Sequence, residues 1–86
     1  MVEKRVRVND VIGKVVVGES GKRMGIVNSL TFIVETGEIL NIVVEQPTKY
    51  LEEFNLKKDE NGRYLIPFHA IKNIGDFVIV SENELV

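Results

Sequence analysis

The sequence lacks several residue types on which common folds and sites depend. It has no cysteine and no tryptophan, and it contains one histidine, His69. The absence of cysteine excludes disulfide bridges, thiolate zinc sites and cysteine nucleophiles. The longest apolar run, residues 77–80, is far shorter than the roughly 20 residues of a membrane-spanning helix, and residues 1–10 lack the apolar stretch of a signal peptide. We therefore expect a soluble cytoplasmic protein without direct membrane insertion.

Alanine is almost absent as well, and the apolar residues present are of one kind. The chain has 14 valines and 9 isoleucines against 6 leucines and a single alanine. β-Branched side chains suit a pleated surface and lose rotamer freedom in helices. A chain of 86 residues also has room for only one domain with a thin core. The composition therefore predicts one all-β domain that spans residues 1–86.

An excess of positive charge is missing too. The net charge is −2 and the sequence pI is about 5.4, whereas nucleic-acid-binding domains commonly have a pI above about 9. Residues 1–25 nevertheless carry six basic and three acidic residues. Within them, Arg5, Arg7, Lys22 and Arg23 form either a local RNA-binding patch or ordinary solvated strand edges and turns. The composition as a whole disfavours nucleic acid as a partner.

Alternating apolar residues and turn signals predict about six short strands with one or two helical turns. The expected strand segments are residues 3–8, 14–17, 23–35, 38–44, 56–58 with 63–66, 71–74 and 77–81. Thr48 is expected to cap a short helix over residues 48–54, and residues 67–70 to form one helical turn. Short strands joined by tight turns predict a small, strongly bent sheet that closes on itself as a barrel.

The central hairpin gives the most specific prediction. Residues 35–37 predict a three-residue loop with Gly37 in the left-handed conformation. In that register Leu30 faces Ile42, and Phe32 faces Leu40, on the core side of the hairpin. A two-residue turn would invert one of the strands, because a slip of one residue exchanges its faces. The apolar pattern therefore favours the longer loop.

The outer face of this hairpin is not cleanly polar. It carries Val27, Ile33, Ile39 and Val43, and a contiguous apolar set on an outer face indicates that something covers it. The cover is either another segment of this chain or a partner. We take these four residues as the candidate interface, and we expect a bulge or bend in the first strand at Asn28.

The chain shows no constellation for catalysis or metal binding. Zinc sites need several His or Cys ligands, and the loop at 59–62 is too short for a calcium site. A catalytic His69 would need a nucleophile and an orienting group, and no serine lies in a nucleophile-elbow pattern. The glycine-rich segment 18–22 has neither the spacing nor the following helix of a phosphate-binding loop. We predict a protein that is not an enzyme and that uses no cofactor or metal.

Three parts of the sequence resemble the PRC-barrel domain family. The first is VIGKVVV at 11–17 followed by GKRMGIV at 21–27, and the second is ETGEILNIVV at 35–44. The third, YLIPFHAIKNIGDFVIV at 64–80, is similar to the closing I-P-x-x-x-V-x-x-x-G-D-x-V-x-V of that family. The likeness runs from about residue 6 to residue 81, with the motifs in the family's order and spacing.

This resemblance implies a small β-barrel without catalytic residues. Such domains occur in the H subunit of photosynthetic reaction centres, at the C-terminus of the ribosome maturation factor RimM, and as short stand-alone proteins, chiefly in archaea. The chain is most similar to the stand-alone group, some of which are cell-division factors that work alongside SepF and the FtsZ ring. We therefore predict an adaptor that forms a dimer with itself or with a related PRC-barrel protein, with cell-division proteins as further candidate partners. The alternative is a RimM-like module that associates with RNA or ribosomes, in RNA processing or ribosome maturation.

Overall fold

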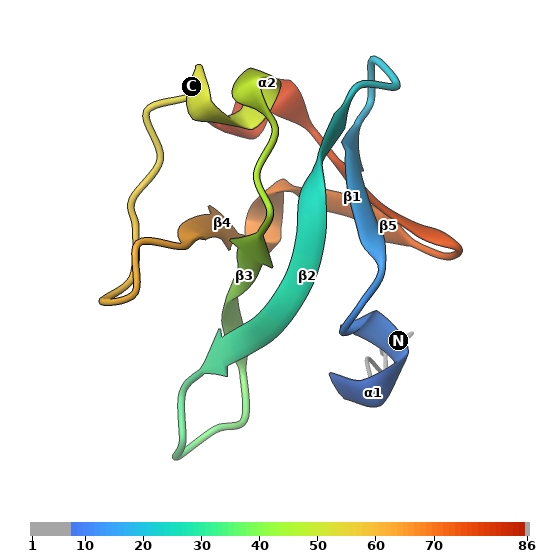
Figure 1. Cartoon of the computed structure of the whole chain (residues 1–86). Helices are drawn as coiled ribbons and strands as arrows, with labels where there is room; N and C mark the ends of the chain where they lie inside the picture. Colours follow the sequence, from blue (N-terminus) through green and yellow to red (C-terminus); the bar gives the residue numbers. More distant parts are fainter. Residues whose placement is uncertain (1–7, 86) are drawn as a thin grey trace.

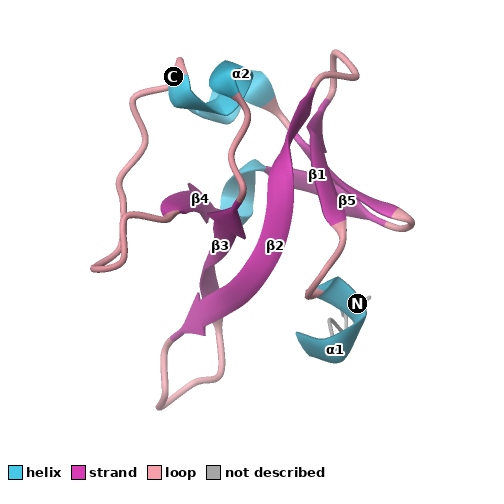
Figure 2. Cartoon of the chain, in the orientation of Figure 1, coloured by secondary structure: helices cyan, strands magenta, loops and turns pink. Residues whose placement is uncertain are grey.

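The computed structural model describes residues 8–85, which fold around one bent, six-stranded sheet (Figures 1 and 2). The strands follow the order β4-β3-β2-β1-β6-β5, and all neighbours are antiparallel except β1 and β6, which run parallel. The strands are β1 (Val15–Gly18), β2 (Arg23–Phe32), β3 (Ile39–Glu45), β4 (Tyr64–Pro67), β5 (Ile71–Ile74) and β6 (Phe77–Val80). The helical turns are α1 (Val8–Val11), α2 (Lys49–Glu52), η1 (Phe68–Ala70) and η2 (Glu82–Leu85).

The sheet is open, so the prediction of a closed barrel is wrong for the part of the chain that the structure describes. Its end strands, β4 and β5, are consecutive in sequence, but η1 separates them and redirects the chain. The outer edge of β4 is paired instead with the segment before it. The amide of Leu65 donates to the carbonyl of Lys57 at 2.9 Å, and Lys58 forms a β-bridge with Tyr64. The fold is mostly β, as the composition predicts, with four short helical segments.

One hydrophobic core joins the sheet to its helical turns. Val11 of α1, Leu51 of α2 and Ala70 of η1 are completely buried against it. The strands supply the other fully buried members, namely Val16, Met24, Val27, Ile42, Val44, Ile66, Val78 and Val80. Because these three helical turns are too short to be stable alone, the buried side chain that each contributes fixes its position.

The predicted short helix and turns are confirmed. Thr48 caps α2, since its hydroxyl oxygen accepts a hydrogen bond from the amide of Leu51 at 3.3 Å. The turn at 59–62 closes through the amide of Gly62, which donates to the carbonyl of Asp59 at 3.1 Å. The predicted helical turn at 67–70 is η1. The predicted first strand, residues 3–8, lies outside the described residues except for Val8, where α1 begins.

The hairpin of β2 and β3 confirms part of the predicted register. Leu30 faces Ile42 as expected, and the extra residue of a bulge is Asn28, whose side-chain amide donates to the Glu45 carboxylate at 2.9 Å. A second irregularity follows Thr31, so Phe32 faces Ile39 and not the predicted Leu40. The two irregularities offset each other, so the pairing from Ser29 to Thr31 is shifted by one residue relative to both the base and the end of the hairpin.

The loop of this hairpin is one residue longer than predicted. The amide of Ile33 donates to the carbonyl of Glu38 at 2.8 Å, and the amide of Gly37 donates to the carbonyl of Ile33 at 2.7 Å. Residues 34–37 therefore form the loop. Gly37 has the predicted positive φ, 75°, a conformation that glycine adopts without steric cost.

Candidate interaction surface

The free end of the β2–β3 hairpin is the most exposed apolar part of the described surface. Phe32, Val34 and Leu40 have exposed fractions of 51%, 87% and 47%, and the hairpin end projects beyond the body of the sheet (Figure 1). Ile33 and Ile39 beside them are half-buried. These five residues are called the apolar tip below. A two-stranded ribbon is only marginally stable in water by itself, and a partner that covers its apolar side chains would stabilise it. The apolar tip is therefore a candidate contact surface.

The tip projects because the neighbouring strand stops short of it. β4 pairs with β3 only from Val44 to Asn41, where its partner is Pro67. Proline has no amide hydrogen to continue the ladder, and η1 begins at the next residue. Ile39 and Leu40 therefore lie beyond the end of β4. At this level β3 has β2 on one side and, within residues 8–85, no strand on the other, so Phe32 on β2 has no neighbouring strand beyond β3.

The four residues of the predicted interface do not share one exposed face. Val27 is part of the hydrophobic core, because the bulge at Asn28 reverses the alternation of β2. Val43 is also buried within this chain, on the central stretch of β3 that is paired on both sides. For these two residues the chain itself supplies the cover. Ile33 and Ile39 are half-buried at the tip, and their contact with a partner stays a prediction.

Sequence reasoning placed Phe32 and Leu40 on the core side of the hairpin and so missed the exposed set. The alternation of apolar residues carries no information on the length of the neighbouring strand. Pro67 was the available signal, because a proline that ends β4 leaves the residues of β3 beyond Asn41 without a paired strand on that side. Val34 lies in the loop, where its branched side chain has no strand to pack against.

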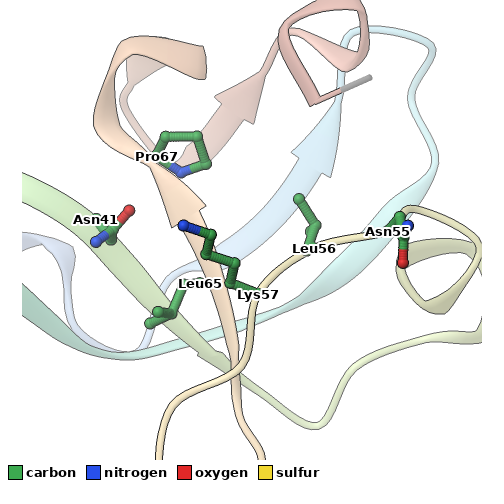
Figure 3. A pocket seen from close by; sticks show the side chains of 6 residues that line it. All are labelled: Asn41, Asn55, Leu56, Lys57, Leu65 and Pro67. Atoms are coloured by element: carbon green, nitrogen blue, oxygen red, sulfur yellow. The ribbon is translucent and has the colours of Figure 1, made fainter.

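A pocket of about 320 Å³ lies beside the same hairpin at Asn41, the last residue of β3 that pairs with β4 (Figure 3). It is lined by Asn41 of β3, Leu65 and Pro67 of β4, and the segment Asn55, Leu56 and Lys57. Figure 3 shows the ammonium end of Lys57 turned toward Asn41 and Pro67. The side-chain amide of Asn41 donates to the Thr31 hydroxyl at 3.1 Å, which holds its carboxamide in place at the edge of the pocket.

The pocket combines an apolar floor with a few polar groups. Leu56, Leu65 and Pro67 supply apolar contact, whereas Lys57 and two carboxamides supply one positive charge and neutral hydrogen-bonding groups. Its volume lies at the lower end of the range of about 300–1,000 Å³ for ligand pockets. Such a site suits one or two side chains better than a large cofactor.

A polar cluster ties together three segments that are distant in sequence. The Glu82 carboxylate of η2 accepts hydrogen bonds from the Ser20 hydroxyl at 2.5 Å, from the Ser20 amide at 3.2 Å and from the Tyr50 hydroxyl of α2. Lys22 places its ammonium 4.8 Å from the centre of the Tyr50 ring. Gly18 lies so close to the Glu82 carboxylate that a Cβ atom there would clash with it.

The hydrogen bonds of this cluster shift two pKa values in opposite directions. The Ser20 hydroxyl, and after it the Tyr50 hydroxyl, lowers the pKa of Glu82, because both donate to its charged form. Glu82 in turn raises the pKa of Tyr50, since the phenol must remain protonated to donate. The cluster fixes η2 and α2 against the β1–β2 turn, which makes it a structural clamp.

The family model for the PRC-barrel domain matches residues 3–86. The chain belongs to the PRC-barrel domain family. The search of curated proteins gave no match. The family supports a small module that is generally not catalytic, and the mostly β structure of residues 8–85 agrees with it.

Candidate catalytic groups in this PRC-barrel domain are kept apart. Ser20 is bound to Glu82, whereas His69 places its Nδ1 atom 3.4 Å from the carboxylate of Glu84, with both side chains largely exposed. A serine–histidine–carboxylate set is therefore not assembled from these residues. Within residues 8–85, no group of three or more His, Cys, Asp or Glu side chains is placed to hold a metal ion.

Two further expectations concern the surroundings of the PRC-barrel domain. None of the helices in the described part of the chain has the length and apolar character that crossing a bilayer requires. Of the predicted basic cluster, Lys22 and Arg23 are exposed at the start of β2. Arg5 and Arg7 lie outside the described residues.

Proposed function

We propose that this PRC-barrel protein is a non-enzymatic protein–protein interaction module that forms a dimer through the apolar tip of its β2–β3 hairpin. The observation that carries the proposal is the joint exposure of Phe32, Val34 and Leu40 on a hairpin end that projects from the sheet (Figure 1). Folding leaves these three large apolar side chains exposed to water. A second protein surface is the simplest way to bury them.

The energetics support a weak, concentration-dependent association. Burying one large apolar side chain contributes about 1.5–3 kcal/mol, and the three exposed residues are already partly covered. The sum is several kcal/mol per chain, and it is opposed by the loss of translational and rotational freedom on association, which costs roughly 4–15 kcal/mol. Two-fold symmetry doubles the contribution, because an isologous interface uses the same patch on both chains.

The partner we propose is a second copy of this chain or a related PRC-barrel protein. Cell-division proteins such as SepF or FtsZ are expected only from the resemblance to stand-alone archaeal members. The RNA-binding alternative is disfavoured by the sequence pI of about 5.4, although Lys22 and Arg23 of its predicted basic cluster are exposed. Purification from the native host with its bound proteins would identify the partner.

Sedimentation velocity over a concentration series tests the proposal. We expect a monomer–dimer equilibrium for the wild type and a shift to monomer for Phe32→Ser. The matched control is Phe77→Ser, because Phe77 is exposed to nearly the same degree, 50% against 51% for Phe32, but lies at the start of β6. A wild type that stays monomeric at millimolar concentration, or a control that dissociates the dimer equally, contradicts the proposal.

The RNA alternative is tested in the same preparation by gel shift with ribosomal RNA. Electrostatic binding to RNA weakens steeply as salt rises, because bound phosphates release their counterions. We expect no shift even at low salt. A salt-sensitive shift would favour the RimM-like function over the adaptor.

A further inference from the structure

The pocket at Asn41 and the loop of the hairpin have complementary chemistry. Val34 is the most exposed large apolar side chain that the structure describes, and Glu35 follows it directly in the loop. The pocket offers the apolar side chains of Leu56, Leu65 and Pro67, with the ammonium of Lys57 between Asn41 and Pro67 (Figure 3). An apolar side chain followed by a carboxylate is the kind of segment that such a pocket receives.

We infer that the pocket binds the hairpin loop of a second copy of this chain, with Val34 on its apolar floor and Glu35 paired with Lys57. This inference rests on the proposed dimer and specifies how its two chains meet. It adds a second contact, the Lys57 pocket, to the apolar tip. The carboxylates of Glu35 in the loop and of Glu38 directly after it carry a charge opposite to that of Lys57.

The topology allows both contacts to form twice in one closed dimer. The loop at 34–37 is one end of the hairpin, and Asn41 and its partner Pro67 lie where the third strand joins the hairpin. In the proposed dimer the two hairpins lie antiparallel across a two-fold axis, with the loop of each chain at the Asn41 pocket of the other. An isologous arrangement of this kind closes on itself and does not propagate into a fibre.

Charge reversal at either end should break the contact. In a dimer of Lys57→Glu chains, the introduced glutamate would face Glu35 at both symmetric positions, and in a dimer of Glu35→Lys chains two lysines would meet. We expect each variant to raise the dimer dissociation constant about tenfold or more, since an attractive pair becomes a repulsive one twice. Both positions are exposed, so each variant should fold like the wild type, which circular dichroism checks.

Mixing the two variants provides the decisive experiment. In a heterodimer of Lys57→Glu with Glu35→Lys, one contact pairs the new glutamate with the new lysine and the other keeps the original Lys57–Glu35 pair. Both contacts are attractive, so sedimentation of the equimolar mixture should show dimer at the wild-type level. The control variants Lys72→Glu, on β5 at the other end of the sheet, and Glu60→Lys, in the other hairpin turn, should dimerise normally alone and mixed.

The outcomes separate this inference from the proposed function. A Lys57→Glu variant that dimerises like the wild type, or a mixture that stays monomeric, overturns the loop-in-pocket contact. If Phe32→Ser still dissociates the dimer in that case, the apolar tip remains the interface and only the pocket is excluded. A monomeric wild type would overturn both.

Discussion

At the scale of single residues, Glu82 joins three segments of the chain through its hydrogen bonds. One carboxylate receives hydrogen bonds from the turn after β1 and from α2. Gly18 leaves the space into which this carboxylate fits. The sequence offered no signal for the cluster, because Ser20 and Tyr50 are 62 and 32 residues away from Glu82 and meet it only when the sheet forms.

Glu82→Gln should remove a pH-dependent part of the stability. The folded-state pKa of Glu82 lies below its ordinary value of 4.5, because Ser20 and then Tyr50 donate to the carboxylate. The stabilisation is therefore present above pH 4.5 and is lost as the pH falls through the folded-state pKa. Urea denaturation at neutral pH should show a less stable variant, and well below pH 4.5 the two proteins should become nearly equal.

The matched control for this comparison is Glu60→Gln, in an exposed turn. It should lose no stability at neutral pH. If Glu82→Gln keeps the acid dependence of the wild type unchanged, the carboxylate is not the group that the hydrogen bonds stabilise.

At the scale of elements, local signals predicted short turns better than the long hairpin. Thr48 indicated α2, and the polar Asn28 indicated the bulge in β2, because both residues act on their own neighbourhood. The length of the loop at 34–37 depends on a second irregularity after Thr31. The apolar pattern cannot reveal that irregularity, since both registers bring apolar residues together.

Thr48→Ala should destabilise the protein by about 0.5–2 kcal/mol, the usual range for loss of an N-cap side chain. The Thr48 hydroxyl accepts from the amide of Leu51 and also donates to the carbonyl of Arg23 at 2.7 Å, so it joins α2 to β2. Denaturant unfolding measures the change. Thr48→Ser keeps the hydroxyl and should retain most of the stability, and an equal loss in both variants would show that the methyl group, not the cap, matters.

At the scale of the whole molecule, the family and the mostly β fold could be predicted from motif order, but the barrel and the interface could not. The open sheet depends on how β4 pairs with residues 57–58 instead of β5. The exposure of the apolar tip depends on where β4 ends relative to the β2–β3 hairpin. Both features depend on pairings between segments that are distant in sequence, which the local pattern does not show. The four-residue interface predicted from alternation consequently divides between the core, the buried centre of β3 and the tip.

The central claim is that two molecules meet at the end of the β2–β3 hairpin. Amide hydrogen exchange of the wild type at low and high protein concentration tests it most directly, because association slows exchange where the chains touch. We expect slower exchange at high concentration for residues 32–41, and no dependence on concentration for residues 71–80 of the β5–β6 hairpin. Exchange at the tip that is independent of concentration, or protection that develops only at β5–β6, would contradict the account.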